Sequence, residues 1–381
     1  MSIADVGTHK NNKQVANGSM ETLSATSTKQ RSLRHWLGRR RGHVLLATFV
    51  LVVCVVLLAV AWGSFSIPPW TIVKILWRRV SGSTGATTWP TSWETVILQI
   101  RLPRILLAAL VGGALSQAGA VYQGLFRNPL ADPYLIGVSS GAGLGATIAI
   151  AFGLRIGLGG LGAVSMLAFS GALVATALVY LLSRIGGRTS VATLLLAGVA
   201  LGAFFASIQT FFMFRSKDAF HTVHIVSWLM GSFNLANWMK VRLLAPVLAF
   251  GGAIIWAYGY RLNVLQLDEE QAQQLGVAVE RARLILIALA SLVTATAVAV
   301  SGVIGFVGLL VPHAVRLVWG PDHRFLLPMS VLVGAVLMII ADGVARTLLA
   351  PAELPVGVVT AFLGAPFFLY LLRQKRQHLF R

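Results

Sequence analysis

The sequence is short of charge, of cysteine and of motifs that bind nucleotides or metals. Charged residues make up 11% of its 381 residues, whereas a soluble globular domain carries about 25%. Its one cysteine, Cys54, excludes a disulfide within the chain. The P-loop pattern G-x-x-x-x-G-K-[ST] is absent, and no Cys and His residues have the spacing of metal ligands. We therefore expect no ATPase site, no metal and no cofactor in this chain.

What the sequence does contain is apolar. Hydrophobic residues make up 56% of it, the mean hydropathy is +0.78, and the 38 glycines suit close packing of membrane helices. A helix needs about 20 apolar residues to cross a bilayer. These features predict an all-α polytopic membrane protein with about ten transmembrane helices. The expected spans are 44–63, 105–125, 134–154, 162–182, 191–213, 243–260, 284–302, 304–319, 325–341 and 354–372.

The basic residues follow a pattern typical of membrane topology. With ten spans and both termini in the cytoplasm, 20 of the 31 Lys and Arg residues fall on the cytoplasmic side, in line with the positive-inside trend. Residues 1–42 are polar and basic, and we expect a disordered cytoplasmic tail there, followed by a ten-span domain over residues 43–381. The first apolar run is long and lacks a clear small-residue cleavage site, so we expect it to stay as a span.

Residues 284–315 contain no Asp, Glu, Lys or Arg but are too few for two full crossings. As a helix they would be about 48 Å long, against about 60 Å for two perpendicular crossings. A single crossing would place Arg316, Arg324 and the basic C-terminus outside, against the charge trend. The glycines within 302–308 therefore predict a tight reversal, followed by a short eighth span buried in protein.

Ionisable side chains are scarce inside the expected spans. The acids Asp132, Asp218, Asp342 and Glu353 fall at predicted edges, whereas carriers driven by ion gradients need carboxylates or broken-helix ion sites inside the membrane. Energy for transport would then come from a partner ATPase. An ion-gradient-driven secondary transporter is the alternative from another class. A passive channel would need polar or charged rings that the sequence does not show.

Six strings of the sequence, in this order, carry a family resemblance: IRLPRILLAALVGGALSQAGAVYQGLFRNPLADPYLIGVSSGAG, LLLAGVALG, VSWLMGSF, GFVGLLVPHAVRL, GPDHRFLLP and LAPAELPVGVVTAFLGAPFF. They resemble the FecCD family, the membrane permeases of ABC importers for ferric siderophores, haem and vitamin B12. The resemblance covers the chain from about residue 44 to its end and implies a permease domain of ten spans in the cytoplasmic membrane of a prokaryote.

The resemblance also implies partners and cargo. It implies a second permease subunit, as a homo- or heterodimer, two cytoplasmic ATPases that hold ATP and Mg, and an extracytoplasmic substrate-binding protein. A ferric siderophore is the expected cargo, with a corrinoid or haem as the alternatives.

The segment NPLADP, residues 128–133, interrupts the apolar sequence. Pro129 and Pro133 end helices and bias the residues before them towards extended or turn conformations, which predicts a short re-entry loop. By resemblance this loop borders the cytoplasmic gate, with Asn128 and Leu130 as gate residues. The alternative, compatible with the first, is a well-capped turn. A second gate element implied between spans four and five falls on Thr189 and Ser190 or on Val191 and Ala192.

Small uncharged residues follow the loop. We expect them to line a wide pathway that holds a bulky solute weakly, so that replacing Gly141 with a large residue should cut uptake without loss of membrane insertion. Generic helix packing is the alternative. The predicted lining residues are Gly137, Ser139, Ser140 and Gly141.

The one sizeable polar inner loop spans residues 265–283. Three acids open it, an amphipathic turn follows, and a glycine breaks that turn. A short acid-capped helix of this kind suits docking into a groove on a partner. By resemblance it is the ATPase-coupling segment, and a solvated connector is the alternative. The residues are Asp268, Glu269, Glu270, Leu275 and Gly276.

Three arginines lie on the outer side, where the charge trend disfavours them. By resemblance, Arg101, Arg104 and Arg346 receive acidic residues of the binding protein. The alternative is local pairing, for instance of Arg346 with Asp342 at i,i+4.

Overall fold

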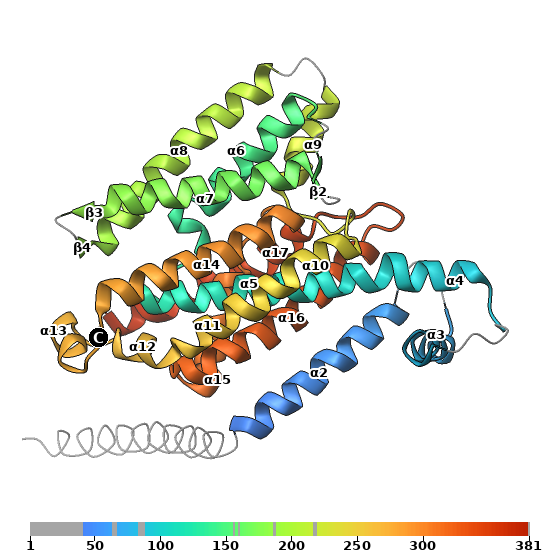
Figure 1. Ribbon diagram of the computed structural model, residues 1–381, viewed down its shortest axis with the longest axis horizontal. Coiled ribbons are helices and arrows are strands. Elements are labelled where there is room, and N and C mark those ends of the chain that lie inside the picture. Colours follow the sequence, from blue (N-terminus) through green and yellow to red (C-terminus); the bar gives the residue numbers. More distant parts are fainter. Residues whose placement is uncertain are drawn as a thin grey trace, which may run out of the picture.

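The computed structural model describes residues 41–62, 67–82, 88–154, 157–158, 161–185, 188–215 and 219–379. Within these residues the protein is helical apart from two short hairpins (Figure 1). The predicted N-terminal tail lies outside the described residues except for its last two, which begin the first helix. The elements are α2 (Arg41–Ala61), α3 (Pro69–Ser81), α4 (Thr91–Thr95), η1 (Val96–Arg101), α5 (Leu102–Leu125), η2 (Pro133–Ile136), α6 (Val138–Ala151), β1 (Gly157–Leu158), β2 (Leu161–Gly162), α7 (Ala163–Ser183), β3 (Arg184–Ile185), β4 (Arg188–Thr189), α8 (Val191–Arg215), α9 (Ala219–Leu229), α10 (Trp238–Pro246), η3 (Val247–Gly251), α11 (Gly252–Ala257), α12 (Gly259–Val264), α13 (Glu269–Gln274), α14 (Val279–Ser301), α15 (Val307–Trp319), α16 (His323–Thr347) and α17 (Val356–Leu379).

The described helices match the ten predicted spans. Seven are long and apolar enough to cross a membrane, counting α4–α5 and α10–α11 each as one continuous helix. Three shorter apolar helices, α6, α15 and the first part of α17, occupy the other predicted positions. The fold class predicted from the sequence is therefore confirmed. Span two begins earlier than predicted, at Thr91, because the helix runs on past Arg101 and Pro103 through a turn of π-helix.

Helix α5 is the centre of the bundle, and α14, α15, α16 and α10 pack around it (Figure 1). Small residues allow this close approach. A Cβ at Gly119 would overlap the carbonyl oxygen of Gly308 on α15, and one at Gly112 would overlap that of Gly334 on α16. Without side chains at these contacts the helix backbones approach one another closely, so van der Waals contact is extensive.

A second group of helices, α6 to α9, forms a layer beside this centre (Figure 1). Helix α6 packs on α7 and α8. Gly198 allows close packing, because a Cβ there would overlap the carbonyl oxygen of Leu135. Gly202 differs, since its nearest neighbour would be the Ser140 hydroxyl at 3.8 Å.

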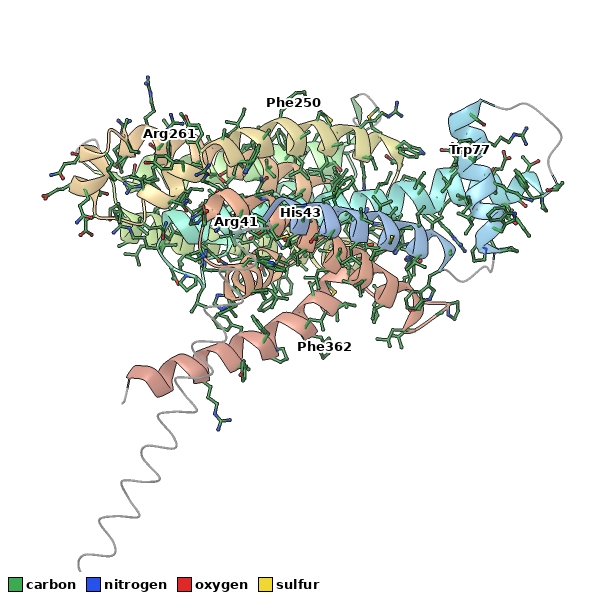
Figure 2. All side chains as sticks on the ribbon, turned by 90° about the horizontal axis from the view of Figure 1, so that it is seen from below. Arg41, His43, Trp77, Phe250, Arg261 and Phe362 are labelled. Carbon is green, nitrogen blue, oxygen red and sulfur yellow. The ribbon has the colours of Figure 1, made fainter. Side chains whose placement is uncertain are left out.

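Large apolar side chains cover the outside of the bundle, as expected where lipid is the solvent. Phe250 and Phe362 point away from it, and α17 diverges from the other helices (Figure 2). Trp77 projects from α3. The hydropathy pattern missed this helix because basic residues interrupt its apolar residues. A short amphipathic helix of this kind suits the membrane interface.

Two of the helices at predicted spans, α6 and α15, are much shorter than the bilayer. The segments that precede them contact each other inside the protein. The predicted reversal is confirmed: α14 ends at Ser301, and residues 302–306 lead into α15, whose 13 residues reach only about 20 Å. Gly302 and Phe306, with φ of +76° and +69°, make the turn. The Tyr134 hydroxyl donates to the Ile304 carbonyl oxygen (2.9 Å) and accepts from the Ile304 amide (3.1 Å). This side chain therefore satisfies irregular backbone that lies away from lipid.

Candidate functional site

The re-entry loop, residues 126–132, begins with a tight cap on α5. The amide of Asn128 donates to the carbonyl of Gln123, and the amide of Arg127 donates to that of Gly124, both at 3.2 Å. This is the Schellman pattern, in which the residue after the cap is left-handed and is usually glycine. Here that residue is Arg127, with φ of +49°.

The rest of the loop is held by its own side chains. Asn128 Oδ1 accepts from the Leu130 amide (3.0 Å), and Asp132 Oδ1 accepts from the Tyr134 amide (2.9 Å). Asp132 thus caps η2, after which Gly137, with φ of +84°, starts α6. The predicted turn and re-entry are confirmed. The Asn128 side chain is exposed and Leu130 is half-buried, and the gate function of both stays a prediction.

The polar inner loop forms the short helix that the sequence indicates. Helix α13 has Asp268 at its N-cap and Glu269 and Glu270 in its first turn, and Gly276 ends it with φ of +77°. Leu275 is exposed at the C-terminal end of α13, whereas Ala272 packs into the core. An exposed leucine beside a short acidic helix suits a contact with a partner. ATPase coupling by the predicted residues of this loop stays a prediction.

The re-entry loop and residues 265–268 of the polar loop bind each other directly. Arg127 Nε donates to the Leu265 carbonyl oxygen (3.0 Å), Nη2 donates to that of Leu267, and Nη1 lies 3.5 Å from Asp268 Oδ1. Gln266 Nε2 donates to the Gly124 carbonyl at the end of α5 (2.8 Å). Two segments far apart in sequence are thereby joined.

A second arginine binds the other side of the polar loop. Arg283, 9% exposed, donates to Glu269 (2.8 Å) and Glu280 (2.5 Å) and to the Thr189 carbonyl (2.9 Å). Glu280 Oε2 in turn accepts from the Thr189 hydroxyl (3.0 Å) and amide (3.2 Å). Thr189 lies directly before α8, in the region of the second expected gate element. Sequence reasoning missed Arg127, Arg283 and Glu280.

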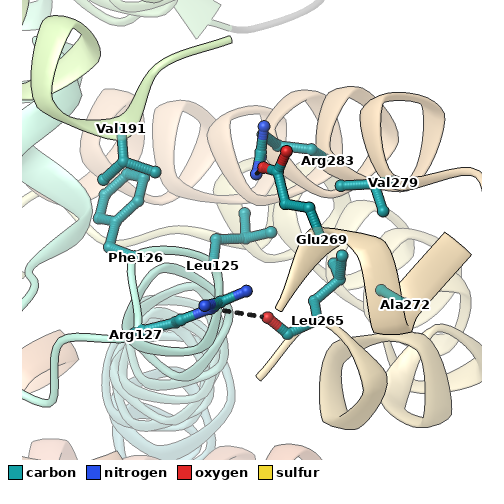
Figure 3. A pocket seen from close by; sticks show the side chains of 9 residues that line it. All are labelled: Leu125, Phe126, Arg127, Val191, Leu265, Glu269, Ala272, Val279 and Arg283. Atoms are coloured by element: carbon teal, nitrogen blue, oxygen red, sulfur yellow. Dashed lines mark hydrogen bonds and ion pairs between the residues drawn. The ribbon is translucent and has the colours of Figure 1, made fainter. Parts of the chain in front are cut away.

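A cavity of about 220 Å³ lies between these groups. Figure 3 shows the Arg127 guanidinium directed at the Leu265 carbonyl on one side and Glu269 beside Arg283 on the other. Apolar side chains from the end of α5, from α8, α13 and α14 form its walls. Four elements therefore meet at one small space whose charged lining residues are Arg127, Glu269 and Arg283.

The predicted lining residues lie at the start of α6, where that helix packs on α7. A Cβ at Gly141 would overlap the Gly171 carbonyl and Ala175 on α7. The Ser140 hydroxyl donates to the Gly137 carbonyl (3.1 Å). Ser139 and Ser140 are both half-buried. Helix packing, the alternative left open by the sequence, accounts for Gly141. A large residue there would push α7 away, so that substitution does not isolate a role in the pathway.

The three predicted docking arginines lie at the opposite end of α5, and each has partners within the chain. Arg104 Nη2 lies 2.9 Å from Asp342 and its Nη1 lies 3.0 Å from Glu353, while Arg346 Nε lies 3.1 Å from Asp342. We call these four residues the outer cluster. Asp342 is 1% exposed, and two arginines compensate the charge of this buried carboxylate.

Arg101 also bonds within the chain. It is 6% exposed and donates to the Val60 carbonyl at the end of α2 (2.9 Å). Local pairing, the alternative considered for these arginines, is thus present. Docking of a partner protein on the three arginines stays a prediction.

At the inner end Asp322 joins three elements. Its carboxylate accepts from Asn263 of α12 (2.8 Å), from the Arg324 amide of α16 (3.1 Å) and from Arg41 of α2. Burial alone would raise the pKa of Asp322, but these hydrogen bonds lower it below its usual value. The charged form therefore fixes the start of α2 against the bundle.

Among the described residues no group of three or more His, Cys, Asp or Glu could hold a metal ion. The polar clusters consist mainly of arginines, carboxylates and backbone carbonyls, a set that joins segments of the chain.

Known proteins resemble this chain over most of its length. Residues 50–374 match the FecCD transport family. A cobalamin import system permease of Halobacterium salinarum is 47% identical and covers 75% of both chains. A hemin transport system permease of Yersinia pestis is 42% identical, over 89% of this chain and 98% of its own.

A solved structure agrees in fold. It is described as an inward-facing conformation of a metal-chelate type ABC transporter, has a TM-score of 0.76 at 35% identity, and covers 87% of this chain and 99% of that one. Sequence and architecture thus agree over the same residues. The chain belongs to the FecCD transport family and is a multi-pass, non-catalytic permease subunit of a prokaryotic ABC transporter.

Proposed function

We propose that this chain forms the import pathway for a bulky metal chelate, driven by ATP hydrolysis on separate subunits. The observation that carries the proposal is the match to the FecCD family over residues 50–374. The scarcity of ionisable groups inside the spans supports an external energy source, since ion-coupled carriers need such groups within the membrane.

The proposed cargo is a ferric siderophore, the commonest cargo of the resembled family. Relatives named for cobalamin and for hemin make those chelates the alternatives. Mass spectrometry of the cognate binding protein, purified from its native host, would identify the cargo. A bound corrinoid or haem in place of an iron siderophore would contradict the finer proposal and leave the importer class intact.

We assign the re-entry loop, with Asn128 and Leu130, to the cytoplasmic gate, and α13 with its flanking residues to ATPase coupling. Their direct contact through Arg127 and Gln266 supports this assignment, because a gate that responds to nucleotide must contact the segment that the ATPase moves. Exposure of Leu275 and of the Asp268 carboxylate, whose side chain is 81% exposed, supports α13 as the docking element.

The outer end is the proposed contact for the binding protein. Exchange of Arg101 and Arg346 for Gln should weaken binding-protein affinity more at low salt than at high salt. Thermal unfolding of the same variants must be measured alongside, because both arginines also bond within the chain. Unchanged affinity at low salt would contradict docking there.

The deciding experiment reconstitutes the permease with its ATPases and binding protein in liposomes. Uptake of the cargo identified above should require ATP and continue when proton and sodium gradients are dissipated. Accumulation by the permease alone, lost when an ion gradient is removed, would establish the secondary transporter instead.

A further inference from the structure

We propose that Arg127 and Arg283 are positioning residues that tie the polar loop to the two halves of the gate, one arginine to each half. The inference rests on the proposed function, since it takes the re-entry loop and the segment before α8 as gate elements. Arg127, in the re-entry loop, binds the polar loop. Arg283, at the end of the polar loop, binds both Glu269 and the segment before α8.

The Arg127 backbone carries the first part of the argument. A residue with a Cβ in the left-handed region costs about 1 kcal/mol or more, and glycine is the usual choice at this Schellman position. The cost is compensated by tertiary contacts: the guanidinium binds the Leu265 and Leu267 carbonyls and lies 3.5 Å from Asp268. Strain that persists because of contacts to another segment points to a function for those contacts.

The choice of arginine suits this geometry. Its planar guanidinium presents five N–H donors in a fixed fork, so one side chain binds two carbonyls and a carboxylate together. These bonds are anchored in the backbone of residues 265–267, which lead directly into α13. A shift of α13 would therefore move Arg127, and Asn128 follows it in the chain.

Arg283 makes the equivalent connection on the other side. It holds Glu269 of α13 and the Thr189 carbonyl at once, and Glu280 holds the Thr189 amide and hydroxyl. Thr189 is 4% exposed and lies two residues before α8 begins. Movement of Glu269 would thus reach the segment at the start of α8 through a different route from that of Arg127.

The single cysteine allows a direct test. In a Cys54→Ser background of the permease with its own ATPases, Leu130→Cys and Ser190→Cys each report one gate half through labelling by a membrane-impermeant maleimide. The readout is the ratio of labelling rates with and without ADP–vanadate, together with the rate of ATP hydrolysis. We expect Arg127→Gly to reduce the Leu130→Cys ratio at least about fivefold, the lower end of a typical coupling factor.

The two arginines should act on different reporters. Arg283→Gln should reduce the Ser190→Cys ratio and spare the Leu130→Cys ratio, and Arg127→Gly should do the reverse. Basal ATP hydrolysis should persist in both variants. Arg261→Ala is the matched control, because it removes an exposed inner-end arginine whose guanidinium lies over the Tyr258 ring, 4.4 Å from its centroid.

Each other outcome has a definite meaning. Ratios unchanged by both arginine variants would overturn the inference while leaving the gate assignment in place. If either arginine variant abolished the nucleotide dependence of labelling at both reporters, the variant would disrupt the inner end in general. That result would also overturn the inference. If labelling of the two cysteine reporters did not depend on nucleotide even with the native Arg127 and Arg283 in place, the gate assignment itself would be overturned, and the inference with it.

Discussion

At the outer end of the bundle, Arg104 and Arg346 hold carboxylates, whereas at the inner end Arg127 holds mainly backbone carbonyls. The side chain of Asp342 in the outer cluster is 2% exposed, whereas the side chain of Asp268 at the inner end is 81% exposed. Both contacts use an arginine, but the partners of Arg127 differ from those of the outer arginines in charge and in access to water.

This difference separates a fixed contact from a movable one. Two buried opposite charges that lose each other leave an uncompensated charge in a low dielectric, so such a pair resists rearrangement. A guanidinium that leaves a carbonyl near water exchanges one hydrogen bond for another, at a net cost of about 1 kcal/mol. The outer cluster therefore suits a rigid end and the inner contacts suit an end that moves.

The largest effect should come from the outer cluster. Arg104→Ala leaves Asp342 with Arg346 as its one cation in the cluster and also frees Glu353, so we expect about 3–5 kcal/mol loss of stability. Thermal unfolding in detergent would measure it. Arg78→Ala, which removes a more exposed pair with Glu94 at 3.6 Å, is the control and should cost less than about 1 kcal/mol. Equal losses would break the comparison.

Arg283→Gln should have an intermediate effect. This arginine is buried, but the side chains of Glu269 and Glu280 are 48% and 37% exposed and regain water when it is lost. We expect about 1–2 kcal/mol from the lost charged hydrogen bonds, read in the same unfolding assay. A loss as large as that of Arg104→Ala would mean that the inner end is held as rigidly as the outer.

Arg127→Gly should change stability less than Arg104→Ala or Arg283→Gln. Glycine relieves the strain of the left-handed backbone, worth about 1 kcal/mol, while hydrogen bonds of similar total worth are lost. We expect a net change within about 1 kcal/mol, measured beside Arg127→Ala, which loses the bonds but keeps the strain. If the alanine variant were as stable as the glycine variant, the strain argument would fail.

Asp268→Ala should have the smallest effect of all. The carboxylate is exposed and 3.5 Å from Arg127, so it contributes no more than about 0.5 kcal/mol in the absence of the ATPase. That contribution should vanish in about 1 M salt, where charges are screened within about 3 Å. A stability difference that persists in salt would place this pair with the outer cluster.

Hydropathy and charge predicted the ten helices and the reversal at 302–306, because a bilayer imposes a length and an apolar composition on each crossing. They missed α3 and the start of span two at Thr91. Both segments carry charges along with their apolar residues, and a helix outside the hydrocarbon core is not required to be apolar. Caps and turns were predictable too, since the effects of Pro133 and Gly276 are local.

Contacts between distant segments were not predictable from the sequence. Nothing in the letters near Arg127 indicates that its partners lie about 140 residues later in the chain. Burial of Asp342 likewise depends on Arg104, which belongs to another helix. The one local signal was an arginine in place of the glycine that usually follows a helix such as α5, and it is recognisable only once the end of that helix is known.

Tyr134 has a mechanical consequence. Its hydroxyl clamps both polar groups of Ile304, and Pro133 beside it contacts Gly308 at the start of α15. The segment after Asn128 and Leu130, which leads into the short helix α6, is therefore bound to the start of the short helix α15. We expect the two helices to move together. A movement of the re-entry loop would then include α6, α15 and the turn between residues 302 and 306. Its rate should be that of a packed unit and slower than that of a free loop.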